Sequence, residues 1–367
     1  MKASLLCTGV LLLALSCQQR PTPPLLHADA VFASPLTSLQ AELGREIFFD
    51  RRLSRPGGQS CASCHQPENA FAEPLATSRG AIPERVGTRN APSLMYASLV
   101  PSPGFNPAGP LVDNEDAGQI GGLFLDGRAR AFEDQVRGPF FNPLEMNLSG
   151  PAELASLLRA APYADKFQLP NGNDEAWVDA AARALAAFLR EPLFTPYNSR
   201  VDAFIAGERQ ALSPQEELGF NLFQSSKSKC SVCHSFAGTE EPRPAFTDHS
   251  YVNLGIPQLP GRDADPGNGK ITGKATDLGR FRVPTLRNVA LTGPWMHDGS
   301  FAKLEDVISF YNSRDIDRKR WGDSAYPETI SQKELGNLQL TPEEEAALVA
   351  FLKALTDRQF ERAQPGR

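Results

Sequence analysis

The pentapeptide Cys-x-x-Cys-His occurs twice in this chain and constrains its fold more than any other feature. Two thiols three positions apart lie on one side of a short helical turn, where each can form a thioether with a vinyl group of one porphyrin. The histidine that follows can then reach the iron as the proximal ligand. The two copies consist of Cys61, Cys64 and His65, and of Cys230, Cys233 and His234.

Two other chemistries use cysteine pairs at this spacing. A zinc site would need a further Cys or His pair nearby, and none follows either copy. A thioredoxin-like redox pair does not need the adjacent histidine and gives no reason for a second copy. We therefore expect two covalently bound c-type haems, with His65 and His234 as iron ligands.

Length and composition fit a loop-rich chain of roughly two domains. The chain has 367 residues and a net charge of −6, so nothing in it predicts binding to nucleic acid. Its 31 prolines and 29 glycines predict long loops. A buried porphyrin would supply the apolar core that such loops lack.

The N-terminal segment has the features of an export signal. An early lysine precedes the apolar run 5–15, which is too short to span a bilayer as a mature anchor. A serine before Cys17 resembles a bacterial lipobox. We expect residues 1–17 to be a lipoprotein-type signal peptide and 18–37 a Pro-rich tether. The alternative is ordinary cleavage that leaves Cys17 free. Either way we expect a periplasmic protein. A lipidated Cys17 would be its only attachment to the membrane.

Three short similarities recur in the same order in both halves, which indicates an internal duplication. Each half has a helix before the haem motif, a middle helix and a closing helix. Ser213 and Thr341 are each followed three residues later by Glu, which predicts two capping boxes. The matched segments are Glu42-Leu43-Gly44 with Glu217-Leu218-Gly219, Asp126-Gly127 with Asp298-Gly299, and Ala184–Arg190 with Ala347–Lys353.

The duplication predicts an all-α fold of two cytochrome c-like domains. We expect the N-terminal domain over residues 38–200 and the C-terminal domain over residues 201–360, each with one haem and long loops. No strand pattern persists in the sequence.

The middle helix predicts a difference between the two haems. In the register of the duplication, Tyr311 corresponds to Pro139. If this position faces the iron opposite the proximal histidine, Tyr311 can close the second haem, whereas Pro139 leaves the first open. Met296 and His297 are alternative sixth ligands, and Tyr311 could instead be a core aromatic. The apolar stripe of this helix, at i, i+3, i+4 and i+7, consists of Leu304, Val307, Ile308 and Tyr311.

From about Leu39 to Leu355 the chain resembles the bacterial di-haem cytochrome c peroxidase family. It is more similar to the MauG-like branch, because Tyr311 stands where classical members carry Met as sixth ligand of the second haem. Classical members also carry a His that blocks the first haem until reductive activation, and residues 77–88 contain no His. Besides the haem motifs, the resemblance is carried by Leu123–Ala129, Gly138-Pro139, Asn142–Met146, Val283–Val289 and His297-Asp298-Gly299.

The resemblance implies further site residues. It implies a catalytic pair above the open haem, Gln135 and Glu145, for which an exposed helix Gln and a solvated loop Glu are the alternatives. It also implies a calcium site between the haems, formed by the side chain of Asn90 and the carbonyls of Thr292 and Pro294.

Three positions bear on how the haems are held and connected. The family places a tryptophan between the haems, and the matching residue here is Leu125. Arg128 and Arg287 follow family motifs, and they either bind haem propionates or form structural salt bridges.

The function that the resemblance implies is reduction of hydrogen peroxide to water at the N-terminal haem. Electrons would come from a small cytochrome c or cupredoxin and pass through the C-terminal haem. The alternatives are MauG-like oxidation of residues on a partner protein and a non-enzymatic di-haem electron carrier. A homodimer is one assembly that the sequence allows.

Overall fold

The computed structural model describes residues 36–106, 118–169, 172–235 and 243–361. The expected signal peptide, Cys17 and most of the expected tether lie outside these ranges. Within them, none of the helices has both the length and the apolar character that crossing a membrane requires.

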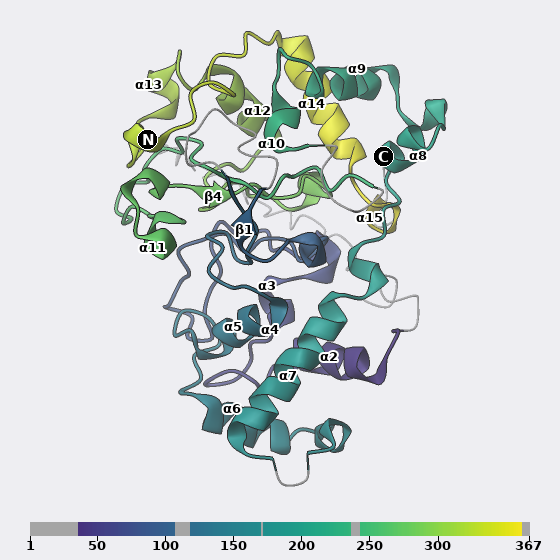
Figure 1. Ribbon diagram of the computed structural model, residues 1–367, viewed down its shortest axis with the longest axis vertical. Helices are drawn as coiled ribbons and strands as arrows, with labels where there is room; N and C mark the ends of the chain where they lie inside the picture. The colour runs from purple at the N-terminus through teal and green to yellow at the C-terminus, as the bar shows by residue number, and fades with distance from the viewer. Residues whose placement is uncertain (1–35, 107–117, 170–171, 236–242, 362–367) are drawn as a thin grey trace, which may run out of the picture.

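Helices dominate the fold and fall into two groups that meet at the middle of the molecule (Figure 1). The N-terminal group contains α2 (Leu39–Phe49), α3 (Cys61–Cys64), α4 (Phe132–Gln135), α5 (Arg137–Phe141), α6 (Pro151–Arg159) and α7 (Asp174–Leu189). The C-terminal group contains α8 (Arg200–Ile205), α9 (Pro214–Phe223), α10 (Cys230–Cys233), α11 (Gly269–Thr272), α12 (Leu304–Ser313), α13 (Arg318–Trp321), α14 (Pro342–Ala354) and α15 (Arg358–Glu361).

Four short strands interrupt the segments between the helices. The strands β1 (Gly104–Phe105) and β2 (Gln119–Ile120) pair antiparallel, as do β3 (Tyr251–Val252) and β4 (Phe281–Arg282). The predicted all-α, two-domain cytochrome c-like class is confirmed, but these strands were not predicted. Two residues are too few to show the alternation by which a strand is recognised in a sequence.

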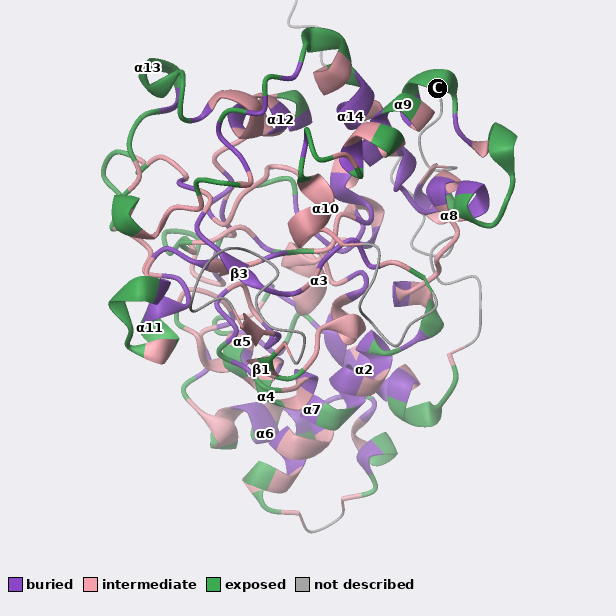
Figure 2. Ribbon diagram, turned by 45° about the horizontal axis from the view of Figure 1, so that its top comes forward, coloured by how far each residue is buried: buried purple, intermediate pink, exposed green. Residues whose placement is uncertain are grey.

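Each group of helices has its own hydrophobic core. The first core draws on buried residues between positions 43 and 194, together with Phe360. The second core draws on buried residues between positions 201 and 355. Figure 2 shows the long helices α7 and α14 with mostly buried and intermediate residues, whereas the short helix α13 is mostly exposed.

The helix before each haem motif packs on the closing helix of the same group. A Cβ added at Gly44 of α2 would lie 2.0 Å from the carbonyl oxygen of Ala184 in α7. A Cβ added at Gly219 of α9 would lie 2.0 Å from the carbonyl oxygen of Ala347 in α14. Glycine permits this close approach in both pairs, so the predicted duplication extends to the contacts between helices.

The predicted helix starts are also confirmed. Ser213 and Glu216 form a capping box at α9, and Thr341 and Glu344 form one at α14. Each box satisfies two backbone N–H groups that the first helical turn leaves without partners.

Two backbone hydrogen bonds join the halves in a reciprocal way. The N–H of Asn90 donates to the carbonyl of His297 at 2.8 Å, and the N–H of Arg282 donates to the carbonyl of Leu125 at 2.9 Å. The segments Ala91-Pro92-Ser93-Leu94 and Val283-Pro284-Thr285-Leu286 match each other. Asn90 and Arg282 are equivalent, because each lies two residues before the proline of its segment. Leu125 and His297 are likewise equivalent, one residue before the matched Asp-Gly pairs. The boundary therefore has approximate two-fold symmetry.

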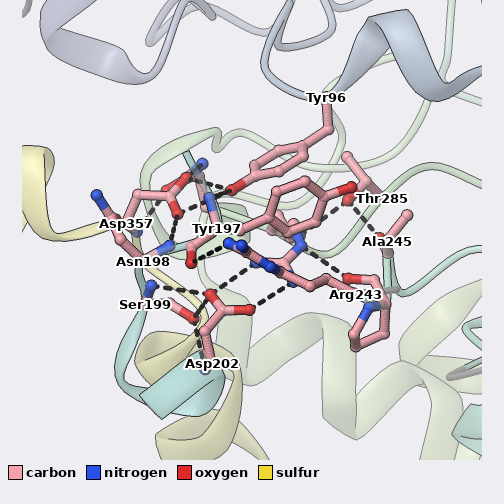
Figure 3. A network of polar contacts seen from close by, with 12 residues as sticks. Tyr96, Tyr197, Asn198, Ser199, Asp202, Arg243, Ala245, Thr285 and Asp357 are labelled. Atoms are coloured by element: carbon pink, nitrogen blue, oxygen red, sulfur yellow. Dashed lines mark hydrogen bonds and ion pairs between the residues drawn. The ribbon is translucent and has the colours of Figure 1, made fainter. Parts of the chain in front are cut away.

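A buried polar network crosses the same boundary (Figure 3). The hydroxyl of Tyr96 donates to Asp357 at 2.9 Å, and the side-chain amide of Asn288 donates to the same carboxylate at 2.7 Å. Beside them, Arg287 forms a bidentate ion pair with Asp202 at 2.8 and 2.9 Å. The Arg287 side chain is 0% exposed, so its charge depends on this partner.

We expect Asp202→Ala to lower the free energy of unfolding by about 3–5 kcal/mol near neutral pH, because it leaves the buried Arg287 cation without a partner. Burial acts to raise the pKa of Asp202, but the hydrogen bonds and charge of Arg287 outweigh it and hold the pKa below its ordinary value. A lowered pKa stabilises the fold at higher pH, and this contribution is lost as the pH falls through the folded-state pKa.

Denaturant unfolding at several pH values measures both effects. The difference in the free energy of unfolding between the unchanged chain and Asp202→Ala should shrink below about pH 4. The control is Glu133→Ala, which breaks the half-exposed pair of Glu133 with Arg190 and should cost about 1 kcal/mol or less. Equal losses in the two variants would contradict the structural role of the Asp202 pair.

Candidate functional site

The two cysteine motifs form the four-residue helices α3 and α10, as their spacing predicts. None of the four cysteines is in a disulfide, so both thiols of each motif are available for thioether bonds. Burial raises the pKa of Cys61 to about 12 and that of Cys64 to about 11. The described residues contain no cluster of three or more His, Cys, Asp or Glu side chains that could hold a metal ion.

A backbone carbonyl orients the histidine of each motif. Nδ1 of His65 lies 3.1 Å from the carbonyl oxygen of Phe71, and Nδ1 of His234 lies 3.0 Å from that of Phe246. A donor N–H at Nδ1 leaves the lone pair on Nε2 for a metal. Burial lowers the pKa of both histidines, that of His234 to about 4, so both rings are neutral, as ligands must be.

The two carbonyls are held by an unusual backbone conformation. Phe71 and Phe246 have φ values of 55° and 54°, in the left-handed region that side chains other than Gly rarely adopt. Next to them, the hydroxyl of Ser93 donates to the carbonyl of Ala70 and that of Thr285 to the carbonyl of Ala245. Sequence reasoning missed these residues, although an Ala-Phe pair after each motif was a signal that could have found them.

A cavity of about 680 Å³ adjoins the second motif. Cys230, Cys233 and His234 line one part of it. The whole predicted stripe of α12 faces it, because Leu304, Val307, Ile308 and Tyr311 all belong to its lining. A largely apolar cavity of this size beside two thiols and a neutral imidazole fits a covalently attached porphyrin.

Tyr311 lies on the cavity wall within electrostatic range of both cysteines of the second motif. Burial, together with Cys233 and Cys230, raises the pKa of its phenol. The two alternative ligands also line the cavity. However, the ring of His297 is stacked on Phe281 with 4.0 Å between centroids, and Met296 packs against a small separate core.

A second pocket, of about 500 Å³, lies on the N-terminal half and includes Glu145 in its lining. The side-chain amide of Asn142 donates to Oε1 of Glu145 at 2.6 Å. Burial raises the pKa of Glu145, although Asn142 and the charge of Arg128 oppose the shift. Glu145 in turn contributes to the raised pKa of both Cys61 and Cys64, so this carboxylate lies near the first haem motif.

Gln135 stays a prediction, although Asp134 next to it lines the same pocket as Glu145. Gln135 is the last residue of α4 and is not part of the lining of the pocket that contains Glu145. Leu125, the residue at the position of the family's tryptophan, lines the larger cavity at the boundary between the halves.

The residues of the expected calcium site all lie at the large cavity. Asn90, Thr292 and Pro294 belong to its lining, although they come from different halves of the chain. The amide nitrogen of the Asn90 side chain donates to the carbonyl of Leu75 at 2.9 Å. The oxygen of the same amide is the atom that a hard cation would bind.

The structure resolves the two alternatives for Arg287 in favour of a salt bridge, because Asp202 occupies its guanidinium. Arg128 is exposed, pairs with Asp126 at 2.8 Å and lies 3.5 Å above the ring of Phe124 at the smaller pocket.

Comparisons with known proteins agree with this geometry. The family model described as di-haem cytochrome c peroxidase matches residues 38–210. The methylamine utilization protein MauG of Paracoccus denitrificans is 36% identical over 90% of this chain and 91% of its own length. The chain belongs to the di-haem cytochrome c peroxidase and MauG family.

Other family members divide between the two names. Cytochrome c551 peroxidase of Nitrosomonas europaea is 33% identical over 89% of this chain and 82% of its own length. The crystal structure of the di-haem peroxidase BthA from Burkholderia thailandensis covers 89% of this chain and 88% of its own, with 33% identity and a TM-score of 0.80. Membership in the di-haem c family therefore does not by itself select one reaction.

Proposed function

We propose that this chain is a di-haem peroxidase. It reduces one hydrogen peroxide to two waters at the N-terminal site, using two protons and two electrons. The electrons come from a small cytochrome c or cupredoxin and pass through the C-terminal site. Cys61, Cys64 and His65 would hold one haem, and Cys230, Cys233 and His234 the other. When bound, the haems supply the iron chemistry that cleaves the O–O bond and carries the electrons.

The half-buried carboxylate of Glu145 is the observation that carries this proposal. Cleaving peroxide to water needs a group that takes a proton from one peroxide oxygen and gives it to the other. Glu145 lines the pocket on the N-terminal half, lies near Cys61 and Cys64, and is oriented by Asn142. Gln135 remains a prediction as the second member of the catalytic pair, because it lies outside that lining.

The contrast between the halves supports different roles for the two sites. Glu145 lines a pocket of the N-terminal half, whereas Tyr311 lines the cavity that the second motif also lines. As the sixth ligand, Tyr311 would favour ferric iron, where methionine would favour ferrous iron. The second site would then accept oxidising equivalents from the first.

Further assignments belong to the same proposal. The protein is exported and acts in the periplasm, anchored by a lipidated Cys17. It consists of a signal peptide (1–17), a tether (18–37) and two domains (38–200 and 201–360). Calcium would bind Asn90, Thr292 and Pro294, which the fold brings to one cavity.

A second candidate function is oxidation of residues on a partner protein. Two observations favour it: the 36% identity to a protein named MauG and the tyrosine, rather than methionine, at position 311. It uses the same peroxide chemistry but takes the two electrons from protein side chains.

We expect Glu145→Gln to lower the rate of peroxide reduction by about 10²–10⁴-fold, because glutamine cannot accept the proton. The activity of the unchanged chain should be lost as the pH falls through the raised pKa of Glu145, since only the ionised carboxylate is a base. Stopped-flow kinetics measures both. The exposed Glu84→Gln is the control. An unchanged rate in Glu145→Gln would remove this carboxylate from the mechanism.

We expect the ferric protein to react with peroxide without prior reduction. Tyr311→Met should raise the reduction potential of the second haem and make the reaction depend on partial reduction, while Tyr311→Phe should lose the spectroscopic signature of a phenolate ligand. Optical and EPR spectra with stopped-flow mixing measure these changes. Turnover of the unchanged chain only after partial reduction would contradict the role of Tyr311.

The nature of the electron source separates the candidate functions. Holoprotein with hydrogen peroxide should oxidise a reduced small cytochrome c steadily, with two cytochromes oxidised per peroxide. Little cytochrome oxidation, together with covalent changes in a partner protein seen by mass spectrometry, would favour the second candidate. Two six-coordinate ferric haems that do not react with peroxide would leave only the electron carrier.

A further inference from the structure

Arg282 occupies a special place at the boundary between the halves. It is the second residue of β4, where its Cα is paired with that of Tyr251 in β3. Its backbone N–H donates to the carbonyl of Leu125, which belongs to the other half. Its side chain lines the 680 Å³ cavity that also contains His234 and Tyr311. The backbone around Arg282 is therefore fixed on two sides, and its side chain is directed to the cavity of the second motif.

The guanidinium of Arg282 has no ion pair among the described residues. Its Nε has no access to solvent and no hydrogen-bond partner. Among the described residues, the polar contact of the guanidinium is from Nη1 to Nδ1 of His249, at 3.5 Å. The buried arginines among the described residues have carboxylate partners: Arg280 pairs with Asp277, Arg287 with Asp202 and Arg314 with Asp315. Arg282 is half-buried and its Nε is shielded from solvent, and a cation in such a place is destabilising without an anion, so an anion is expected at Arg282.

His249 lies beside the guanidinium of Arg282. It is 4% exposed, has a φ of 57° and lines the same cavity. Its Nδ1 faces the Arg282 donor, which assigns the ring hydrogen to Nε2. Nε2 is buried and has no partner among the described residues. His249 therefore accepts from Arg282 and offers it no negative charge, so the remaining Nη–H groups of the guanidinium are left for a carboxylate at the cavity.

We propose that Arg282, with His249 beside it, binds a propionate of the haem attached to Cys230 and Cys233. The propionates are the carboxylates that this haem brings into the cavity, and Arg287, an expected partner for one, is already bound to Asp202. The bound propionate lies at the boundary with the N-terminal half, because Leu125 holds the Arg282 backbone there. This assignment depends on haem attachment and not on the peroxidase reaction.

The pairing has a consequence for the redox balance between the haems. A positive charge that neutralises a propionate favours the ferrous over the ferric state of the same haem. Loss of the charge at position 282 should therefore lower the reduction potential of the C-terminal haem and leave that of the N-terminal haem almost unchanged.

Spectroelectrochemistry and resonance Raman spectroscopy on the holoprotein test the assignment. We expect Arg282→Gln to lower the potential of the C-terminal haem by about 59 mV or more, which is a tenfold change in a one-electron equilibrium constant. The propionate bending bands of this haem should shift in the same variant. The control, Arg318→Gln, removes one positive charge from the exposed helix α13 of the same half and should change neither measurement.

A second variant covers failure of Arg282→Gln to fold or to receive haem. Arg282→Lys keeps the positive charge but not the planar guanidinium. The reduction potential of the C-terminal haem should therefore shift by less than a tenfold change in the equilibrium constant, while the propionate bands still shift. Propionate bands and a C-terminal potential that match those of Arg318→Gln would overturn the assignment. The assignment would also be overturned if added chloride changed the reduction potential of the C-terminal haem in the unchanged protein, since the anion at Arg282 would then be an exchangeable ion.

Discussion

The hydrogen bond from each motif histidine to a backbone carbonyl is the constraint on which both sites depend. It fixes the imidazole tautomer and leaves the lone pair of Nε2 available to an iron. The acceptor carbonyls belong to Phe71 and Phe246, whose left-handed φ values have to be maintained by the surrounding structure. Both phenylalanine rings are fully buried and pack on aromatic neighbours, so the hydrophobic core and the ligand geometry stabilise each other.

The duplicated scaffold makes the proximal sides of the two sites alike and leaves the opposite sides to differ. In the C-terminal half the middle helix is the continuous α12, which carries Tyr311 to the cavity wall. In the N-terminal half the corresponding segment is divided into α4 and α5 around Val136, and Pro139 occupies the equivalent position. Chemical asymmetry between the sites therefore arises from a local change in one helix, without any change in the packing of α2 on α7 or of α9 on α14.

The sequence predicted the features that depend on side-chain type and spacing. Both motifs, the capping boxes, the paired helices and the apolar stripe with Tyr311 were recognised in this way. It could not predict the role of the Phe71 carbonyl, because every residue has a carbonyl and the backbone dihedral angles determine where it points. It also could not decide between a propionate and a salt bridge for Arg287, because its partner Asp202 is 85 positions away along the chain. An unpaired cation such as Arg282 is visible only when all of its neighbours are known.

The boundary shows how one backbone arrangement can serve two electrostatic purposes. Asn90 and Arg282 occupy equivalent positions and donate equivalent hydrogen bonds across the boundary, to His297 and Leu125. Asn90 is neutral and would need a bound cation, the proposed calcium, to bring positive charge to its side. Arg282 brings its own charge. Leu125 cannot relay charge as an aromatic ring could. The reciprocal backbone bonds would help to set the relative positions of the two haems, and the charge of Arg282 would act on their relative potentials.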